Sequence, residues 1–252
     1  MDVTRLRRLL KEVDEEHRDT MGSAVDGLAE LAFRREHAPS RRSFLRGGVI
    51  AAGGSALVIG PLAGAAMAAD PTTTTAAATT TTAAPKGPQE ADLALLGYAQ
   101  SLELAAVEVY TQAVSSGHLT PATVDVTVAF RRHHTDHSQA IGGLAGKRAL
   151  GVANRSVVKA FGGRALRAND EAGVLTVAYE LENAVAATYA YAIGTLQGTN
   201  PAAVLSSILS IEGRHAVLLG QALGKSVTDI IPLFQTANLA SGLDPAKNPI
   251  EG

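Results

Sequence analysis

The chain has 252 residues, of which 46% are hydrophobic and 4% are aromatic, and it contains neither cysteine nor tryptophan. Without cysteine it has no disulfide, thiolate metal site, cysteine nucleophile or lipoprotein attachment site. Its formal net charge of -2 argues against a nucleic-acid partner, which would require a basic surface. The length allows one or two domains, and a core built mostly of Ala, Leu and Val suits closely packed helices.

Residues 1–39 form a charged N-terminal extension. Its apolar residues recur at roughly helical spacing: Leu6, Leu9, Leu10 and Val13. This spacing predicts that parts of the extension are amphipathic helix. Such a segment could handle export or a partner, but we favour an extended basic region with no role in the mature protein. His17 and His37 are predicted to be ordinary surface residues.

An export signal is predicted over residues 40–69. The stretch opens with SRRSFL, continues as an uncharged run rich in Gly and Ala, and ends near an Ala-Met-Ala triplet. A basic region, a modest hydrophobic region and an A-x-A cleavage site are the parts of a signal peptide. The stretch resembles a twin-arginine signal, matching it at all six places of residues 40–45. The resemblance implies the twin-arginine machinery as partner and a periplasmic, cell-envelope or extracellular location.

A membrane anchor is the alternative reading of the same stretch. Residues 47–69 are uncharged and long enough to span a bilayer, so an uncleaved tether stays open. Their low content of Leu, Ile and Phe favours the export signal. The next segment, residues 70–88, is rich in Thr, Ala and Pro without apolar periodicity and is predicted to be a linker.

Four helical segments are predicted within a globular domain at 89–235, which a tail at 236–252 follows. They span residues 91–117, 121–146, 169–198 and 201–224. Thr120 and Asn169 are the expected N-caps of the second and third, and Asn200 precedes Pro201 at the start of the fourth. Short turns join the first segment to the second and the third to the fourth, which predicts two antiparallel hairpins.

About two dozen residues separate the second segment from the third. That length can return along a helix of roughly 37 Å. Two hairpins joined by one long crossover form the ferritin-like arrangement. The predicted fold class is therefore all-α, an antiparallel four-helix bundle without a sheet.

Glutamate and histidine recur at matching positions in the two hairpins. The first hairpin carries Glu103 and then His137, 34 positions later, and the second carries Glu182 and then His215, 33 positions later. Each of the two glutamates precedes a tyrosine by seven residues, Tyr110 and Tyr189. The chain therefore contains an internal repeat of a helix with Glu followed by a helix with His.

Two further residues lie three positions before the histidines of this repeat. Glu212 precedes His215, and His134 precedes His137, so each pair shares one helix face. Glu212 lies between ILSI and AVLL, which predicts a buried carboxylate, and such a group is costly unless it is paired or bound to metal.

With these features the chain resembles the ferritin-like proteins that hold two iron or two manganese ions. In that family two helices give one Glu each and two give Glu-x-x-His. The resemblance covers residues 91–222 and implies these metal ligands: Glu103, His134, His137, Glu182, Glu212 and His215. It implies iron or manganese, as one or two ions. The chain departs from the family at His134, which stands where a bridging Glu is expected, and imidazole does not bridge two cations as a carboxylate does.

Structural readings remain open for the same residues. The glutamates and His215 could form a hydrogen-bonded network without metal, and His134 could be a solvated neighbour of Arg131 and Arg132. His133 is predicted to be a second-shell or surface residue and an alternative ligand, and Asp136 is a ligand only if the helix is rotated. The two tyrosines are predicted to be core residues with hydrogen-bonded hydroxyls. Glu108 and Glu180 are predicted to be surface or second-shell residues, and His118, beside Gly117 in a turn, is predicted to be exposed.

Two functions from different classes follow. The first is an exported metal-binding protein that oxidises ferrous iron or handles oxygen or peroxide. The second is a non-enzymatic envelope scaffold or stress-related bundle without metal. The sequence leaves open whether the chain is an enzyme, because an open coordination position is not visible in it.

Overall fold

The computed structural model describes residues 2–36, 86–226, 230 and 242–250. Contacts divide the chain into two units, Met1–Phe33 with Pro85–Gly252, and Arg34–Ala84. Only 34–36 of the second unit are described. The predicted signal or anchor at 40–69, most of the linker at 70–88, and His37 therefore lie outside the described residues.

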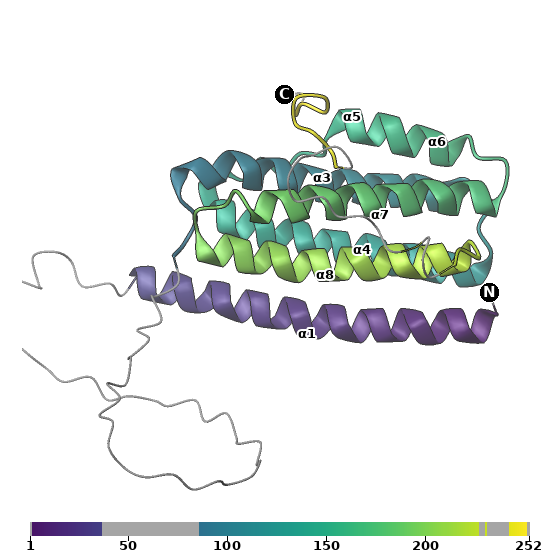
Figure 1. The fold of residues 1–252 in the computed structure, drawn as a ribbon, viewed down its shortest axis with the longest axis horizontal. Helices are drawn as coiled ribbons and strands as arrows, with labels where there is room; N and C mark the ends of the chain where they lie inside the picture. Colours follow the sequence, from purple (N-terminus) through teal and green to yellow (C-terminus); the bar gives the residue numbers. More distant parts are fainter. Residues whose placement is uncertain (1, 37–85, 227–229, 231–241, 251–252) are drawn as a thin grey trace, which may run out of the picture. The chain divides into compact units, whose positions relative to one another are not determined.

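The first unit contains the predicted bundle (Figure 1). Its four long helices are α3 (Glu90–Ser115), α4 (Pro121–Ala145), α7 (Glu171–Ile193) and α8 (Thr199–Ala222). Short turns join α3 to α4 and α7 to α8, and a long crossover joins the two hairpins (Figure 1). No strand occurs in the described parts of the chain, so the all-α prediction is confirmed.

The helix starts agree with the sequence prediction at one of three positions. Thr120 is the N-cap of α4, with Pro121 as its first residue, as predicted. At α7 the N-cap is Asp170, whose carboxylate accepts a hydrogen bond from the Gly173 amide at 2.8 Å, so the prediction of Asn169 was wrong by one residue. Helix α8 begins before Asn200, at Thr199, with Gly198 as N-cap.

A tertiary contact explains the early start of α8. The carboxylate of Asp92, in the first turn of α3, accepts hydrogen bonds from the amides of Gln197 and Gly198 at 2.8 and 3.0 Å. This contact holds the turn that leads into α8 against the start of α3. Nothing in the local sequence around Asn200 could have revealed it.

The crossover between the hairpins contains short helical pieces. They are a 3₁₀ turn (Gly146–Arg148), α5 (Arg155–Val157), a π-helical turn (Val158–Gly162) and α6 (Gly163–Leu166). Val157 and Ala165 are fully or almost fully buried, and Ala165 packs with Ala113 and Val174. The crossover therefore contributes to the core as well as connecting the two hairpins.

Helix α8 is long and apolar enough to cross a bilayer, with a mean hydropathy of 1.3. No other helix in the described residues meets both conditions. Half of that apolar window is buried inside the protein, and a core helix of a bundle has the same composition. The ionisable Glu212 and His215 on its inner face fit the core position.

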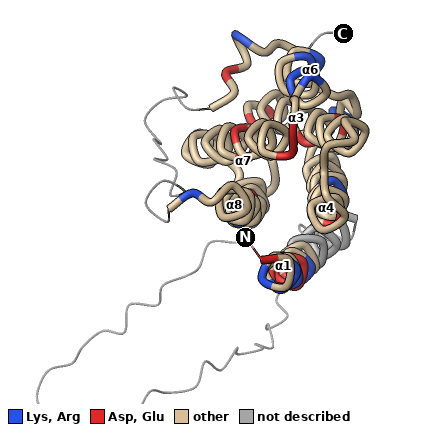
Figure 2. Tube along the Cα trace, turned by 90° about the vertical axis from the view of Figure 1, so that its right-hand side faces the viewer, with Lys and Arg blue, Asp and Glu red and all other residues tan. Residues whose placement is uncertain are grey.

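The N-terminal extension is a helix, α1 (Val3–Glu36), with charges of both signs along it (Figures 1 and 2). Leu6, Val13 and Met21 are buried and belong to the same apolar cluster as the bundle. His17, predicted to lie on the surface, is 4% exposed, so that prediction was wrong. The reason is its register, because His17 lies four residues after Val13 and four before Met21, on the buried stripe of the helix.

Candidate metal centre

All four bundle helices contribute to one buried polar cluster at the centre of the bundle. The six predicted site residues are each 0% exposed. They come from α3 (Glu103), α4 (His134 and His137), α7 (Glu182) and α8 (Glu212 and His215). Fully buried side chains of the core surround them, and the ring of Phe130 stacks on His215 with centroids 3.8 Å apart. The structure therefore brings together every residue of the predicted set.

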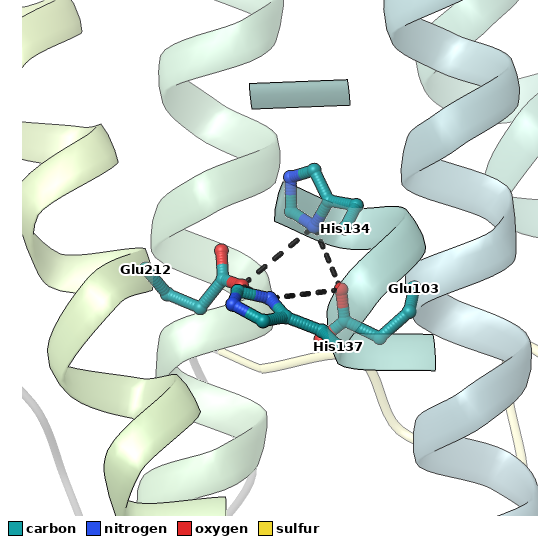
Figure 3. Close-up of side chains that lie close together, drawn as sticks. All are labelled: Glu103, His134, His137 and Glu212. Carbon is teal, nitrogen blue, oxygen red and sulfur yellow. Dashed lines mark hydrogen bonds and ion pairs between the residues drawn. The ribbon is translucent and has the colours of Figure 1, made fainter. Parts of the chain in front are cut away.

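The cluster contains two overlapping groups of ligand atoms. Glu103, His134, His137 and Glu212 form the first group (Figure 3), and His134, Glu182, Glu212 and His215 form the second. Within each group the ligand atoms lie within 4.8 Å of one another. His134 and Glu212 belong to both groups.

His134 lies between two carboxylates. Its Nδ1 is 2.7 Å from Oε2 of Glu103, and its Nε2 is 3.1 Å from Oε1 of Glu182. Burial lowers the pKa of His134, but Glu212, Glu182 and the hydrogen bond to Glu103 together raise it well above its usual value. His134 is then an imidazolium that donates to both carboxylates. The alternative of a solvated residue beside Arg131 and Arg132 was wrong.

His137 and Glu212 are the unsatisfied members of the cluster. Nδ1 of His137 lies 2.8 Å from Oε1 of Glu212, but the angles there do not make a hydrogen bond. Both ring nitrogens of His137 and both oxygens of Glu212 are buried without a hydrogen-bond partner among the described residues. Buried polar atoms without partners are costly, and donor atoms about 3 Å apart are spaced as ligands of one small cation are. The residues therefore fit a metal ion.

The pKa values of the three carboxyl groups are shifted in opposite directions. Burial raises the pKa of Glu103, but His137 and His134 outweigh burial and lower it to about 2. The pKa of Glu182 is likewise lowered well below its usual value by His134 and His215, against burial. Burial raises the pKa of Glu212 well above its usual value, and the charges of Glu182 and Glu103 add to that effect. The neighbouring His134 opposes this rise.

Each of the first two carboxylates is also held by a tyrosine. The Tyr110 hydroxyl donates to Oε1 of Glu182, and the Tyr189 hydroxyl donates to Oε1 of Glu103. Both rings are buried, which confirms the prediction of core tyrosines with hydrogen-bonded hydroxyls.

His133 lies behind the ligand residues and contacts one of them, His215. It is 0% exposed, so the surface alternative was wrong. Its Nδ1 lies 2.9 Å from Nε2 of His215, and its Nε2 lies 2.8 Å from Oδ1 of Asp14, on α1. It belongs to neither group of ligand atoms.

Asp14 and His17 are the residues near the site that sequence reasoning missed. The ring of His17 stacks on His133 with centroids 3.8 Å apart. Burial lowers the pKa of His17 to about 3, and His137 and His215 add to the effect. The position of His17 on the apolar stripe of the N-terminal helix was the signal that could have found it.

The other polar residues considered lie away from the cluster. Glu108 and Glu180 form ion pairs with Arg155 and Arg164 of the crossover, at 2.6 and 2.7 Å. His118 is exposed, as predicted. Asp136 is partly exposed and belongs to neither group of ligand atoms, with His17 as its nearest ionic partner at 3.9 Å.

The profile of the ferritin-like domain family matches residues 91–225, slightly more than half of the chain. The chain belongs to the ferritin-like family. No similar protein was found among curated sequences, and none among solved structures. The match covers all four bundle helices, so the family assignment and the buried cluster concern the same part of the molecule.

Within the ferritin-like pattern this chain has one exchange. The pattern asks for a Glu on each of two helices and a Glu-x-x-His on each of the other two. Glu103, Glu182, and Glu212 with His215 follow it, and α4 has His134 before His137 in place of Glu. The exchange replaces a negative ligand by an imidazole whose two nitrogens lie 2.7 and 3.1 Å from the carboxylates of Glu103 and Glu182.

Proposed function

We propose that this ferritin-like protein binds iron or manganese at the buried cluster. The observation that carries the proposal is the unsatisfied pair formed by His137 and Glu212. A purely structural network would satisfy its buried polar atoms with one another. Glu103 and His134 are hydrogen-bonded to each other. The buried polar atoms of His137 and Glu212 have no hydrogen-bond partner among the described residues, and a metal ion would be that partner.

The donor set supports the choice of metal. Carboxylate and imidazole ligands suit iron, manganese or zinc, and the chain has no thiolate to favour a softer ion. Iron or manganese held by these residues would supply redox chemistry, with oxygen or peroxide as the oxidant for ferrous iron. The three carboxylates of the protein favour a cation, and their burial in the core excludes bulk water.

The overlap of the two ligand groups bears on the number of ions. His134 and Glu212 belong to both groups, so two ions would have to share these two residues. A carboxylate can bridge two cations, whereas an imidazole binds one metal through one nitrogen. We therefore propose that one ion binds more tightly than a second.

The experiment is metal analysis of the full chain purified without added metal, followed by anaerobic titration with Fe(II) and with Mn(II). Binding to the native state raises the melting temperature by mass action. His137→Ala and Glu212→Gln should each remove most of that rise. His118→Ala, which changes an exposed histidine, is the matched control. If the wild-type chain takes up neither ion, the cluster is a structural network and the protein is a scaffold bundle.

We also propose export through the twin-arginine route, because residues 40–69 have the form of that signal. The partner is the export machinery, and the destination is the periplasm, the envelope or the medium. Replacing Arg41 and Arg42 together by Lys should leave the precursor in the cytoplasm. Unchanged export of this variant would overturn the assignment, and a full-length product in the membrane fraction would indicate an uncleaved tether at 47–69.

A further inference from the structure

A chain of hydrogen-bonded groups runs from α1 to the centre of the bundle. Oδ1 of Asp14 lies 2.8 Å from Nε2 of His133, and Nδ1 of His133 lies 2.9 Å from Nε2 of His215. The other nitrogen of His215, Nδ1, faces the carboxylates of Glu182 and Glu212 at 3.3 and 3.4 Å. We propose that Asp14 is a positioning residue of the metal centre, which orients His215 through His133 and makes α1 a functional fifth helix of the site. This inference rests on the proposed metal binding.

The chemistry of the three groups sets the direction of the hydrogen bonds. An ionised carboxylate only accepts, so Nε2–H of His133 donates to Asp14. A neutral His133 then has a lone pair on Nδ1, which accepts from Nε2–H of His215. Two neutral imidazoles have only two N–H groups for the three contacts between Asp14 and Glu182, and the two shorter contacts, at 2.8 and 2.9 Å, take them. Nδ1 of His215 then keeps its lone pair, and its 3.3 Å approach to Glu182 is a contact between two acceptors, which a bound cation would relieve. Partners of this kind fix the orientation and basicity of a histidine ligand.

Several contacts hold α1 in place for this role. Leu6, Val13 and Met21 bury apolar side chains in the cluster shared with the bundle. Arg132 of α4 donates to Asp14 at 2.5 Å, which fixes the carboxylate beside His133. Glu16, two residues after Asp14 on α1, forms an ion pair with Arg214 of α8 at 3.1 Å.

His17 completes the contact by covering His133. The two rings are stacked with an interplanar angle of 16°, and His17 is 4% exposed. The stack covers one face of the His133 ring, while the side chain of Asp14 is 25% exposed. In the sequence α1 precedes residues 40–69 and the bundle follows them. Export through a signal there separates α1 from the bundle, whether or not the signal is cleaved, so the proposed role of Asp14 concerns the chain before export.

The test compares Asp14→Ala with Glu16→Ala in the full chain. Both variants remove one α1 carboxylate that pairs with a bundle arginine, but only Asp14 contacts His133. Loss of an outer-shell partner typically weakens metal binding by about 10- to 100-fold. Asp14→Ala should show such a loss in Mn(II) affinity measured by chelator competition, and Glu16→Ala should stay within about twofold of wild type. Asp14→Asn, which keeps an acceptor oxygen, should fall between them.

A second readout needs no metal. Long-range ¹H–¹⁵N spectra of the histidine rings in the metal-free chain report which nitrogen carries the proton. His215 should be protonated at Nε2 in the wild type and in Glu16→Ala, and should lose that preference in Asp14→Ala. His215→Gln assigns the signals.

The outcomes separate the two proposals. If the wild-type chain binds no Mn(II) or Fe(II), metal binding is wrong. If it binds and Asp14→Ala matches Glu16→Ala in both affinity and tautomer, metal binding stands and the positioning role of Asp14 is refuted.

Discussion

The hydroxyl of Tyr110, on α3, donates a hydrogen bond to the carboxylate of Glu182, on α7. The same contact occurs in the opposite direction, from Tyr189 on α7 to Glu103 on α3. A tyrosine of each hairpin therefore donates a hydrogen bond to a glutamate of the other hairpin. The seven-residue spacing that is repeated in the sequence places each tyrosine two turns from the glutamate of its own helix.

Removing either hydroxyl should destabilise the protein. Tyr110→Phe and Tyr189→Phe each remove one hydrogen-bond donor from a fully buried carboxylate, and a hydrogen bond to a charged group contributes about 1.5–3 kcal/mol. The two losses should be similar, because the contacts are related by the internal repeat. Urea unfolding of the metal-free chain measures them, with Tyr191→Phe, a partly exposed tyrosine of α7, as control. Equal stability of all three variants would show that the buried hydroxyls contribute nothing.

His134→Glu should increase the number of bound ions toward two. The substitution replaces the imidazolium between Glu103 and Glu182 by a carboxylate and completes the ferritin-like ligand pattern. Without metal the variant should be less stable than the wild type, since the new carboxylate has no cation to pair with. Metal analysis after reconstitution gives the count.

His134→Gln is the control for that experiment. It removes the positive charge but adds no negative ligand, so its count should stay near one. A wild-type count in His134→Glu would mean that the geometry at this position, rather than the charge, limits binding.

The stability of the metal-free chain should be greatest near pH 6.5. The pKa of His215 is lowered by burial to about 4, that of His17 is lowered by burial to about 3, and that of His133 is lowered by burial and the neighbouring histidines. Between pH 6.5 and about 4.5 the unfolded chain binds three protons at these groups that the folded chain does not. Glu212, whose pKa is raised, offsets one of them. Stability should therefore fall with decreasing pH by about 3 kcal/mol per unit.

The opposite slope is expected above pH 6.5. There the folded chain keeps protons on His134 and Glu212, whose pKa values are raised, while the unfolded chain has lost them, so stability decreases as pH rises. Urea unfolding in the presence of chelator at half-unit steps from pH 4.5 to 8.5 gives the profile. His17→Phe, which keeps the ring stack, should make the acid slope shallower by one proton. A flat profile would contradict the assigned protonation states.

Gly213→Ala should stabilise the protein by about 0.5–1 kcal/mol, because glycine inside a helix costs that much relative to alanine. Gly213 lies in the middle of α8, and a Cβ built there meets nothing within 4 Å. It lines a groove of about 570 Å³ between α1 and α8. Thermal melting measures the gain. Gly220→Ala is the contrast, because its Cβ would come within 2.6 Å of Ile230, and it should not stabilise.

The bundle and its central cluster could be predicted because their signals are local. The hairpins are specified by helical spacing of apolar residues, by proline at the start of a helix and by one long connection. Residues three positions apart, such as Glu212 and His215, share one face of a helix. The internal repeat then aligned Glu103 with Glu182 and His137 with His215. Burying an unpaired carboxylate costs free energy, so Glu212, between ILSI and AVLL, was predicted to have a polar partner or a metal.

The role of α1 and the charge of His134 could not be predicted, because both depend on contacts between distant segments. Asp14 and His133 are 119 positions apart, and no local pattern places one beside the other. Two carboxylates from other helices lie against the two nitrogens of His134 in the buried core. In water the pKa of the imidazole would be near 6.5; burial lowers it, and the charges of Glu212 and Glu182 with the hydrogen bond to Glu103 raise it well above that value.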